Sequence, residues 1–319
     1  MTQPSTSPTR VVVVGAGHVG ATFAYTLLLQ GLASEIVLVD VDRERAEGEA
    51  MDLSHAVPLT HPARVRVGDY ADCAGAALTV ITGGAAQRPG EGRTELAQRN
   101  TQIFREIVPQ IAAADPDGIL LVATNPVDVL TYAAWKLSAF PPERVIGSGT
   151  VLDTARFRFL LSQHYGVDPR SVHAHIIGEH GDSEVPAWSL ANIAGMPLER
   201  FCVAHGLEHD AAVMDSFFVQ TRDAAYGVIE RKGATYYAIG AALARIVEAV
   251  LRDQKSVLSV SSLVQGAYGI QDVCLSLPSV VGRGGVESIL RLDLSPGEVE
   301  QLRRSAATIR STIALLGLA

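Results

Sequence analysis

A valine run followed by closely spaced glycines, near the start of the 319-residue chain, constrains the fold more than any other feature. Residues 11–20 read VVVVGAGHVG, which predicts a buried strand that turns directly into a helix. Gly15 permits the tight turn, Gly17 lets a pyrophosphate approach the backbone, and Gly20 lets the helix pack closely on the sheet. The motif predicts a dinucleotide-binding turn, although a purely structural glycine turn competes with that interpretation.

The residue that follows the second predicted strand favours the binding interpretation and indicates the ligand. This strand, residues 35–39, leads into Asp40, twenty residues after Gly20. A carboxylate there can bond both hydroxyls of a ribose and repels a 2′-phosphate, so the pattern favours NAD over NADP. Asp42 is predicted instead to cap the helix that begins at Arg43.

The first half of the chain alternates apolar runs with helical patterns, which is typical of a parallel sheet with crossover helices. Its strands are continuous and β-branched, as expected when helices cover both faces of a sheet. We therefore predict an α/β fold with a Rossmann-type, doubly wound parallel sheet in an NAD-binding domain at 11–150. An α/β substrate domain is expected at 151–319, and a disordered tail at 1–10. The predicted strands are 11–14, 35–39, 65–67, 78–82, 119–124 and 145–146.

After residue 150 the pattern changes to longer helices with few strands. We predict helices at 152–165, 211–231 and 234–252, and a strand near 172–177. Short β-like pieces follow Ser256. The last predicted helix, 295–316, begins with a capping-box pattern.

Composition excludes several classes of function. A net charge of −8 argues against a nucleic-acid partner, which would require concentrated Lys and Arg. No apolar run reaches the ~18 residues that span a bilayer, and the N-terminus lacks the apolar stretch of a secretory signal. The three cysteines are odd in number and form no CxxC pair, so we expect a reduced, cytoplasmic setting.

A histidine and an Asp/Arg pair suggest acid/base chemistry on an anion. Asp153 and Arg156 are spaced i, i+3 on a predicted helix and therefore share one face. His180 lies in the turn Gly-Glu-His-Gly-Asp after an apolar strand, where packing explains it poorly. A neighbouring carboxylate would fix its tautomer and favour its charged form. An exposed salt bridge is the alternative for the Asp/Arg pair.

Two polar segments follow strands at their carboxyl ends, where open α/β sheets place their ligands. Asn125 follows the strand at 119–124, and a turn role competes with a binding role there. Residues 83–93 form a glycine-rich polar loop that ends at Arg93. A lid that delivers Arg93 to a polarised carbonyl explains this composition better than an ordinary surface loop does.

From Val11 to the C-terminus, the chain resembles the lactate/malate dehydrogenase family. The motifs GAGHVG, TNPVD, LDTARFR, GEHGDSE and KGATYY occur in family order. The resemblance implies a Rossmann domain followed by an α/β substrate domain, NAD as cofactor, and commonly a homotetramer.

The resemblance also implies a role for each matching residue. His180 would donate and accept the proton, with Asp153 as its orienting partner. Arg156 would clamp the substrate carboxylate in a bidentate pair, and Arg93 would polarise the reacting carbonyl. The implied reaction is hydride transfer from NADH to the carbonyl carbon of pyruvate, and its reverse oxidises L-lactate.

Three further positions follow from the same resemblance. Asn125 and Thr235 would line the nicotinamide and substrate pocket. Gln87 stands in the loop where relatives that act on malate carry arginine, so an extra substrate carboxylate would stay unpaired and pyruvate is favoured. Arg88 would enter the pocket after a one-residue shift, but Pro89-Gly90 anchors the register.

Arg158 and His173 suggest regulation. Arg158 lies about 140° around the helix from Asp153, away from the expected site. Both residues match the pair that binds fructose 1,6-bisphosphate between subunits in bacterial members of the family. A solvated or interface charge is the alternative for Arg158.

Three competing functions remain open. Cys202, His205 and His209 have a metal-like spacing, but an incidental role is favoured and no metal site is predicted. A metal would suggest an NAD-dependent glycosidase. A malate dehydrogenase, disfavoured by Gln87, and a non-catalytic NAD-binding protein also compete with the favoured function.

Overall fold

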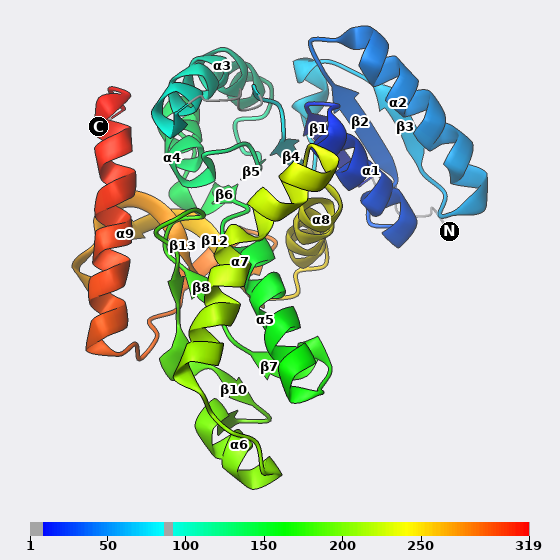
Figure 1. Cartoon of the computed structure of the whole chain (residues 1–319). Helices are drawn as coiled ribbons and strands as arrows, with labels where there is room; N and C mark the ends of the chain where they lie inside the picture. The colour runs from blue at the N-terminus through cyan, green and yellow to red at the C-terminus, as the bar shows by residue number, and fades with distance from the viewer. Residues whose placement is uncertain (1–8, 86–91, 319) are drawn as a thin grey trace, which may run out of the picture.

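The computed structural model describes residues 9–85 and 92–318. The strands of the first half are β1 Arg10–Val14, β2 Glu35–Val39, β3 Arg64–Val67, β4 Leu78–Ile81, β5 Leu120–Val122 and β6 Val145–Gly147. They are all parallel and lie in the order β3-β2-β1-β4-β5-β6 (Figure 1). The chain winds outward from β1 first to one side and then to the other, so the predicted doubly wound sheet is confirmed.

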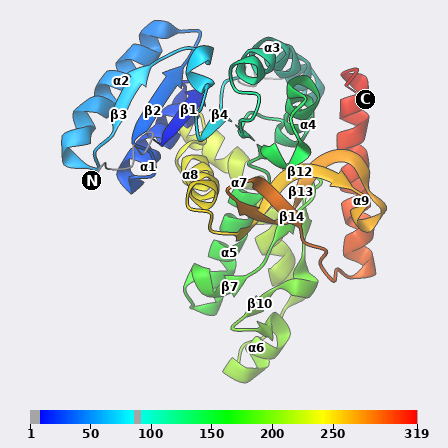
Figure 2. The same ribbon diagram turned by 180° about the vertical axis from the view of Figure 1, so that it is seen from behind.

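Helices cover both faces of this sheet, because alternate residues of each strand point to opposite sides. Val11 and Val13 of β1 pack in one buried cluster with α1, α2 and α8. Val12 and Val14 pack in another cluster with α3 and α4. Figures 1 and 2 show these two helical layers from opposite sides. The helices are α1 His18–Gln30, α2 Arg43–Ala56, α8 Tyr237–Leu251, α3 Arg93–Ala114 and α4 Val127–Ser138.

The second half of the chain extends the same sheet beyond β6. Strands β12 Ser256–Gln265, β13 Gln271–Gly282 and β14 Gly285–Ile289 add antiparallel to it. The sequence predicts only short β-like pieces after Ser256, whereas β12 and β13 are long strands of 10 and 12 residues. Ser259, Ser261 and Ser262 of β12 are buried, and the strand pairs with both β6 and β13. The sheet therefore continues across the predicted domain boundary at residue 150.

The remaining elements form the lower lobe in Figure 1 and the helix that carries the C-terminus. The strand predicted at 172–177 is wrong as a single element, because β7 pairs with β10 and β8 pairs with β9 in separate small sheets. The predicted capping box of the last helix is confirmed between Ser295 and Glu298. These elements are α5 Val151–Tyr165, β7 Val172–His173, β8 Ile176–Ile177, β9 Val185–Pro186, β10 Asn192–Ile193, β11 Met196–Pro197, α6 Leu198–His205, α7 Ala211–Lys232 and α9 Pro296–Leu315.

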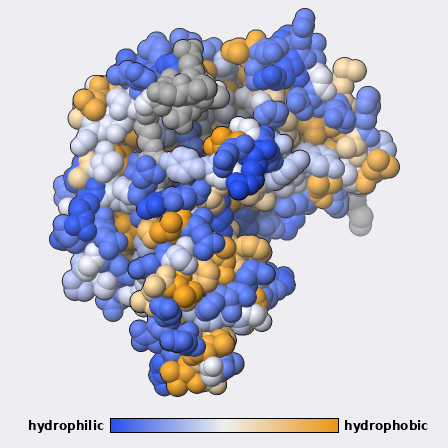
Figure 3. All heavy atoms as spheres, viewed as in Figure 1, coloured by the Kyte–Doolittle hydropathy of each residue, from blue (hydrophilic) through white to orange (hydrophobic). Residues whose placement is uncertain are grey.

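Residues 1–8 of the predicted tail at 1–10 lie outside the described residues. Arg10 is the first residue of β1, where its Nε donates to Glu35 Oε2 at 2.6 Å. Hydrophilic residues cover most of the face in Figure 3, with apolar groups between them. Among the helices in the described residues, none is long and apolar enough to cross a membrane.

Candidate active site

The three glycines of the turn after β1 have different surroundings, which explain glycine at each position in a different way. Gly15 has a φ of +106°, and a Cβ added to it would lie 2.4 Å from the Gly83 nitrogen. A Cβ on Gly20 would lie 1.8 Å from the Gly15 carbonyl oxygen, so close packing of α1 requires glycine there. A Cβ on Gly17 would meet nothing within 4 Å. The space beside Gly17 is therefore open, as a bound pyrophosphate requires.

The carboxylate of Asp40 lies against this turn. Its Oδ2 accepts the Ala16 N–H at 2.5 Å, and its Oδ1 accepts the Asp42 N–H at 2.9 Å. In the described residues no side chain caps α1, so the N–H groups of its first turn are left for phosphate oxygens. The arrangement fits a dinucleotide. The prediction that Asp42 caps α2 is confirmed, because it accepts the Arg45 N–H at 3.1 Å.

His180, Asp153 and Arg156 form one connected group. His180 Nδ1 lies 2.5 Å from Asp153 Oδ2, and Arg156 Nη1 donates to Asp153 Oδ1 at 2.8 Å. Asp153 is 2% exposed at the start of α5, whereas the His180 side chain is 25% exposed. Burial alone would raise the pKa of Asp153, but its two cationic partners hold that pKa below its usual range. Burial also opposes protonation of His180, and the Asp153 carboxylate nevertheless raises the pKa of His180 to about 9.

Two more buried carboxylates lie beside His180, and sequence reasoning missed both. Asp128, in the first turn of α4, accepts the His180 N–H on its Oδ2 at 2.7 Å. Glu184 is 6% exposed, and burial together with the charge of Asp153 raises its pKa to about 9. Burial therefore favours the neutral form of Glu184. Both belong to the motifs TNPVD and GEHGDSE, which offered the only sequence signal for them.

Asn125 follows the carboxyl end of β5, close to the segment that follows β4. The Asn125 carbonyl accepts from Asn100 Nδ2 at 2.7 Å, and the Thr124 hydroxyl donates to the Gly83 carbonyl at 2.8 Å. The residue before Asn125 thus bonds the segment after β4, and Gly83 of that segment lies against Gly15 in the turn after β1. The structure places it at the predicted edge of the sheet.

Two other predicted substrate-binding residues can be placed by the elements that carry or flank them. Thr235 lies in the connection between α7 and α8, and Arg93 is the first residue of α3. Gln87 lies outside the described residues. The roles of these three residues stay predictions.

Arg158 lies apart from the acid/base group. Its Nε donates to the Ala174 carbonyl at 2.9 Å, and it lines a cavity of about 270 Å³ with Arg170, His175 and Arg245. His173 is exposed on β7. Burial and the charges of Arg158 and His173 lower the pKa of His175 to about 4. His173 is therefore close enough to influence His175, although it does not line the cavity.

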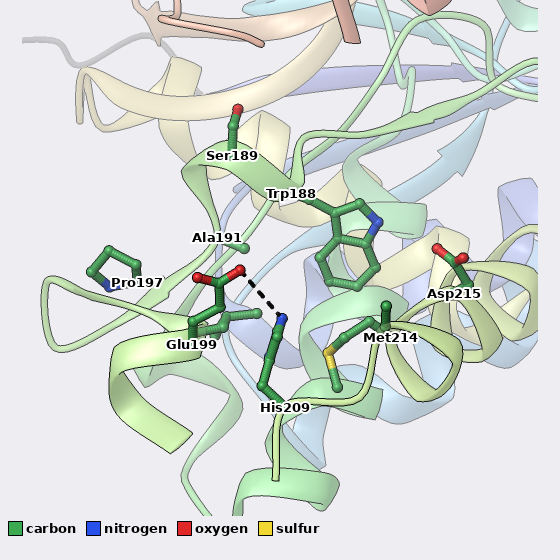
Figure 4. A pocket seen from close by; sticks show the side chains of 10 residues that line it. Trp188, Ser189, Ala191, Pro197, Glu199, His209, Met214 and Asp215 are labelled. Carbon is green, nitrogen blue, oxygen red and sulfur yellow. Dashed lines mark ion pairs between the residues drawn. The ribbon is translucent and has the colours of Figure 1, made fainter. Parts of the chain in front are cut away.

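The three residues of the metal-like spacing, Cys202, His205 and His209, have other hydrogen-bond and ion-pair partners in the structure. Cys202 Sγ lies 3.9 Å from His209 Nδ1, whereas His205 Nδ1 lies 2.9 Å from the Phe201 carbonyl. His209 Nε2 also pairs with Glu199 at 3.9 Å, in a cavity of about 370 Å³ (Figure 4). In the described part of the chain, no group of three or more His, Cys, Asp or Glu side chains could hold a metal ion.

Comparisons with known proteins agree with this geometry. Residues 9–147 match the NAD binding domain of the lactate/malate dehydrogenase family, and residues 150–316 match the α/β C-terminal domain of that family. The chain belongs to the lactate/malate dehydrogenase family. It is thus an NAD-dependent oxidoreductase, as the resemblance implied.

Curated relatives and solved structures are similar over nearly the whole chain. The L-lactate dehydrogenase of Acetivibrio thermocellus is 53% identical over 310 residues, which cover 97% of this chain and 98% of the relative. L-lactate dehydrogenase 1 of Clostridium acetobutylicum is 51% identical over 305 residues, which cover 96% of this chain and 97% of the relative. The ligand-bound crystal structure of minor L-lactate dehydrogenase from Enterococcus mundtii superposes with a TM-score of 0.92 at 42% identity, covering 96% of this chain and 98% of that one.

Proposed function

We propose that this enzyme is an L-lactate dehydrogenase that reversibly reduces pyruvate with NADH. The observation that carries the proposal is the group formed by His180, Asp153 and Arg156, which combines a proton carrier with a cation for a carboxylate. The curated relatives from Acetivibrio thermocellus and Clostridium acetobutylicum, each more than 50% identical to this chain, bear that name.

The first half of the chain would hold the cofactor. Gly17 and the start of α1 would face the pyrophosphate, and Asp40 would bond the ribose hydroxyls. Asn125 would lie beside the nicotinamide. When bound, NADH supplies the hydride that reaches the carbonyl carbon of the substrate.

The residues of the site would supply the proton and hold the substrate. Because His180 Nδ1 faces Asp153, the proton exchanged with the substrate oxygen belongs on Nε2. Asp153 fixes this orientation and stabilises the protonated ring. Arg156 would bind the pyruvate carboxylate through two parallel N–H groups, and Arg93 would polarise the carbonyl.

The choice of substrate provides the test of the function. We expect NADH oxidation with pyruvate and much less with oxaloacetate, because Gln87 cannot neutralise a second carboxylate. Gln87→Arg should raise the oxaloacetate-to-pyruvate ratio of kcat/KM by about a hundredfold. Following NADH absorbance with each keto acid measures both. If wild-type enzyme reduces neither acid, the proposed function fails, and an unchanged ratio in the variant would remove Gln87 from the pocket.

The basic surface around Arg158 supports a proposal of allosteric control by fructose 1,6-bisphosphate. An activator with two phosphates suits Arg158 and His173, because Arg170 and Arg245 line the same cavity as Arg158 and concentrate positive charge there in a chain of net charge −8. We expect millimolar effector to lower KM for pyruvate by about tenfold, a coupling of ~1.4 kcal/mol. Arg158→Gln should lose this response. Kinetics of the wild type that ignore the effector at neutral pH would contradict the proposal.

A homotetramer and a cytoplasmic location complete the proposal. Val41, Leu59 and Val203 are large apolar side chains that are exposed in the single chain. Contacts between subunits could bury such side chains, which supports an oligomer. Cys73, Cys202 and Cys274 are all free and buried, which suits a reducing compartment.

A further inference from the structure

Asp128 contacts the backbone of His180, and Asp153 contacts the ring of the same residue. It lies in the first turn of α4, and its Oδ2 accepts the His180 N–H at 2.7 Å. Asp128 is 2% exposed, and its Oδ1 has no hydrogen-bond partner among the described residues. His180 is therefore held by one buried carboxylate at its backbone and by another at its ring.

A buried carboxylate with a single strong hydrogen bond is a costly way to hold a backbone N–H. Burial raises the pKa of Asp128 to about 7, although the nearby Ser261 hydroxyl and His180 both favour its charged form. A neutral amide could accept the same N–H at lower cost. The acidic group therefore needs a reason beyond packing.

Its surroundings indicate that reason, because the negative charge of Asp128 acts on His180 together with that of Asp153. Arg156 is the nearby cation, and its described partner is Asp153. Asp128 thus has, among the described residues, no cation of its own except a protonated His180. The polar and ionisable groups around Asp128 and His180 are Asp153 and Arg156 on α5, Glu179 and Glu184 beside His180, Ser261 on β12 and Cys274 on β13.

We propose that Asp128 is a positioning residue for His180, which fixes the backbone of the catalytic turn and favours the protonated imidazole electrostatically. The inference rests on the proposed function. Asp128 also lies three residues after Asn125, in the first turn of α4, and Asn125 directly precedes the N-cap of that helix, Pro126. The beginning of α4 thereby sets the nicotinamide side of the site and the position of the proton carrier together.

Two substitutions separate the bond from the charge. Asp128→Asn keeps an acceptor for the His180 N–H and removes the charge. We expect it to lower the His180 pKa by about one unit, since a nearby opposite charge shifts a pKa by roughly one to three units. The pH midpoint of pyruvate reduction should fall with it. Asp128→Ala removes the bond as well and should lower kcat about tenfold or more, with little change in KM.

The measurements use the full-length enzyme. NMR titration of the His180 ring without cofactor gives its pKa directly, and steady-state kinetics give kcat, KM and the pH profile. Asp272→Asn is the matched control, because it makes the same exchange at another carboxylate that accepts a hydrogen bond. The donor to Asp272 is the hydroxyl of Tyr132 on α4, at 3.0 Å. It should leave the His180 titration unchanged.

Two results would overturn the inference. One is an Asp128→Asn enzyme that retains the wild-type His180 pKa and pH profile. The other is an Asp128→Ala enzyme that loses thermal stability while kcat and pH profile stay as in the wild type, which would leave only a structural role. If the wild type reduces no pyruvate, the proposed function fails, and the NMR titration still tests the effect of Asp128 on His180.

Discussion

His180→Asn should lower kcat for pyruvate reduction by about a thousandfold. A positioned acid/base group contributes roughly 10²- to 10⁴-fold, and asparagine can neither donate nor accept the proton at the substrate oxygen. Asp153 and Arg156 stay in place, so the affinity for pyruvate should change little. Stopped-flow measurement of NADH oxidation gives the rate, and fluorescence titration checks that NADH still binds.

His55→Asn, an exposed substitution near the end of α2, is the control and should match the wild type. The wild-type pH profile adds a second check. In the proposed mechanism pyruvate reduction needs protonated His180, so its rate should be sustained at low pH and fall as the pH rises through the His180 pKa. Because Asp153 raises that pKa, the fall should come above pH 6.5; the oxidation of lactate should rise over the same interval. A His180→Asn enzyme within tenfold of the wild type would assign the proton transfer to another group.

Arg156→Gln should lower kcat/KM for pyruvate by about a thousandfold. Two charge-assisted hydrogen bonds to the substrate carboxylate would be lost, which corresponds to about 4 kcal/mol. The substitution also removes the partner of Asp153 Oδ1. Arg156→Lys should recover only part of the loss, because an ammonium lacks the planar fork of the guanidinium.

Arg43→Lys provides the matched control for Arg156→Lys. Arg43 is exposed on α2 and pairs with Glu47, so this exchange should leave kcat/KM unchanged. Steady-state kinetics with varied pyruvate at saturating NADH make the comparison. An unchanged KM and kcat in Arg156→Gln would mean that a different cation holds the carboxylate.

The sequence predicted the first half of the fold more accurately than the second. Continuous valines and spaced glycines are strong local signals, and they identified the parallel strands, the turn at Gly15 and the cap at Asp42. Serine-rich β12 lacked such a signal, because its burial depends on pairing with β13 and on contact with β6. The interval 172–177 has an apolar pattern, but its two ends pair with different partners.

In the site, sequence reasoning identified side chains and missed some of their neighbours. Asp153 and His180 were paired from residue type and motif, and the structure places their atoms 2.5 Å apart. Asp128 contacts His180, which lies 52 residues further along the chain. Glu184 is buried, but its sequence context is equally compatible with an exposed acidic residue in a surface turn. Only the packing of α4 against the catalytic turn distinguishes these carboxylates from ordinary surface charges.

The continuity of the sheet restricts how this enzyme can admit its substrate. Ser261 of β12 pairs with Gly147 of β6, and the Thr150 N–H donates to the Ser259 carbonyl at 3.1 Å. A hinge that swung the two halves apart would have to break these backbone bonds on every turnover. Entry and release of small molecules must therefore depend on segments attached to a fixed frame. Rotation of one half against the other should therefore contribute little to turnover.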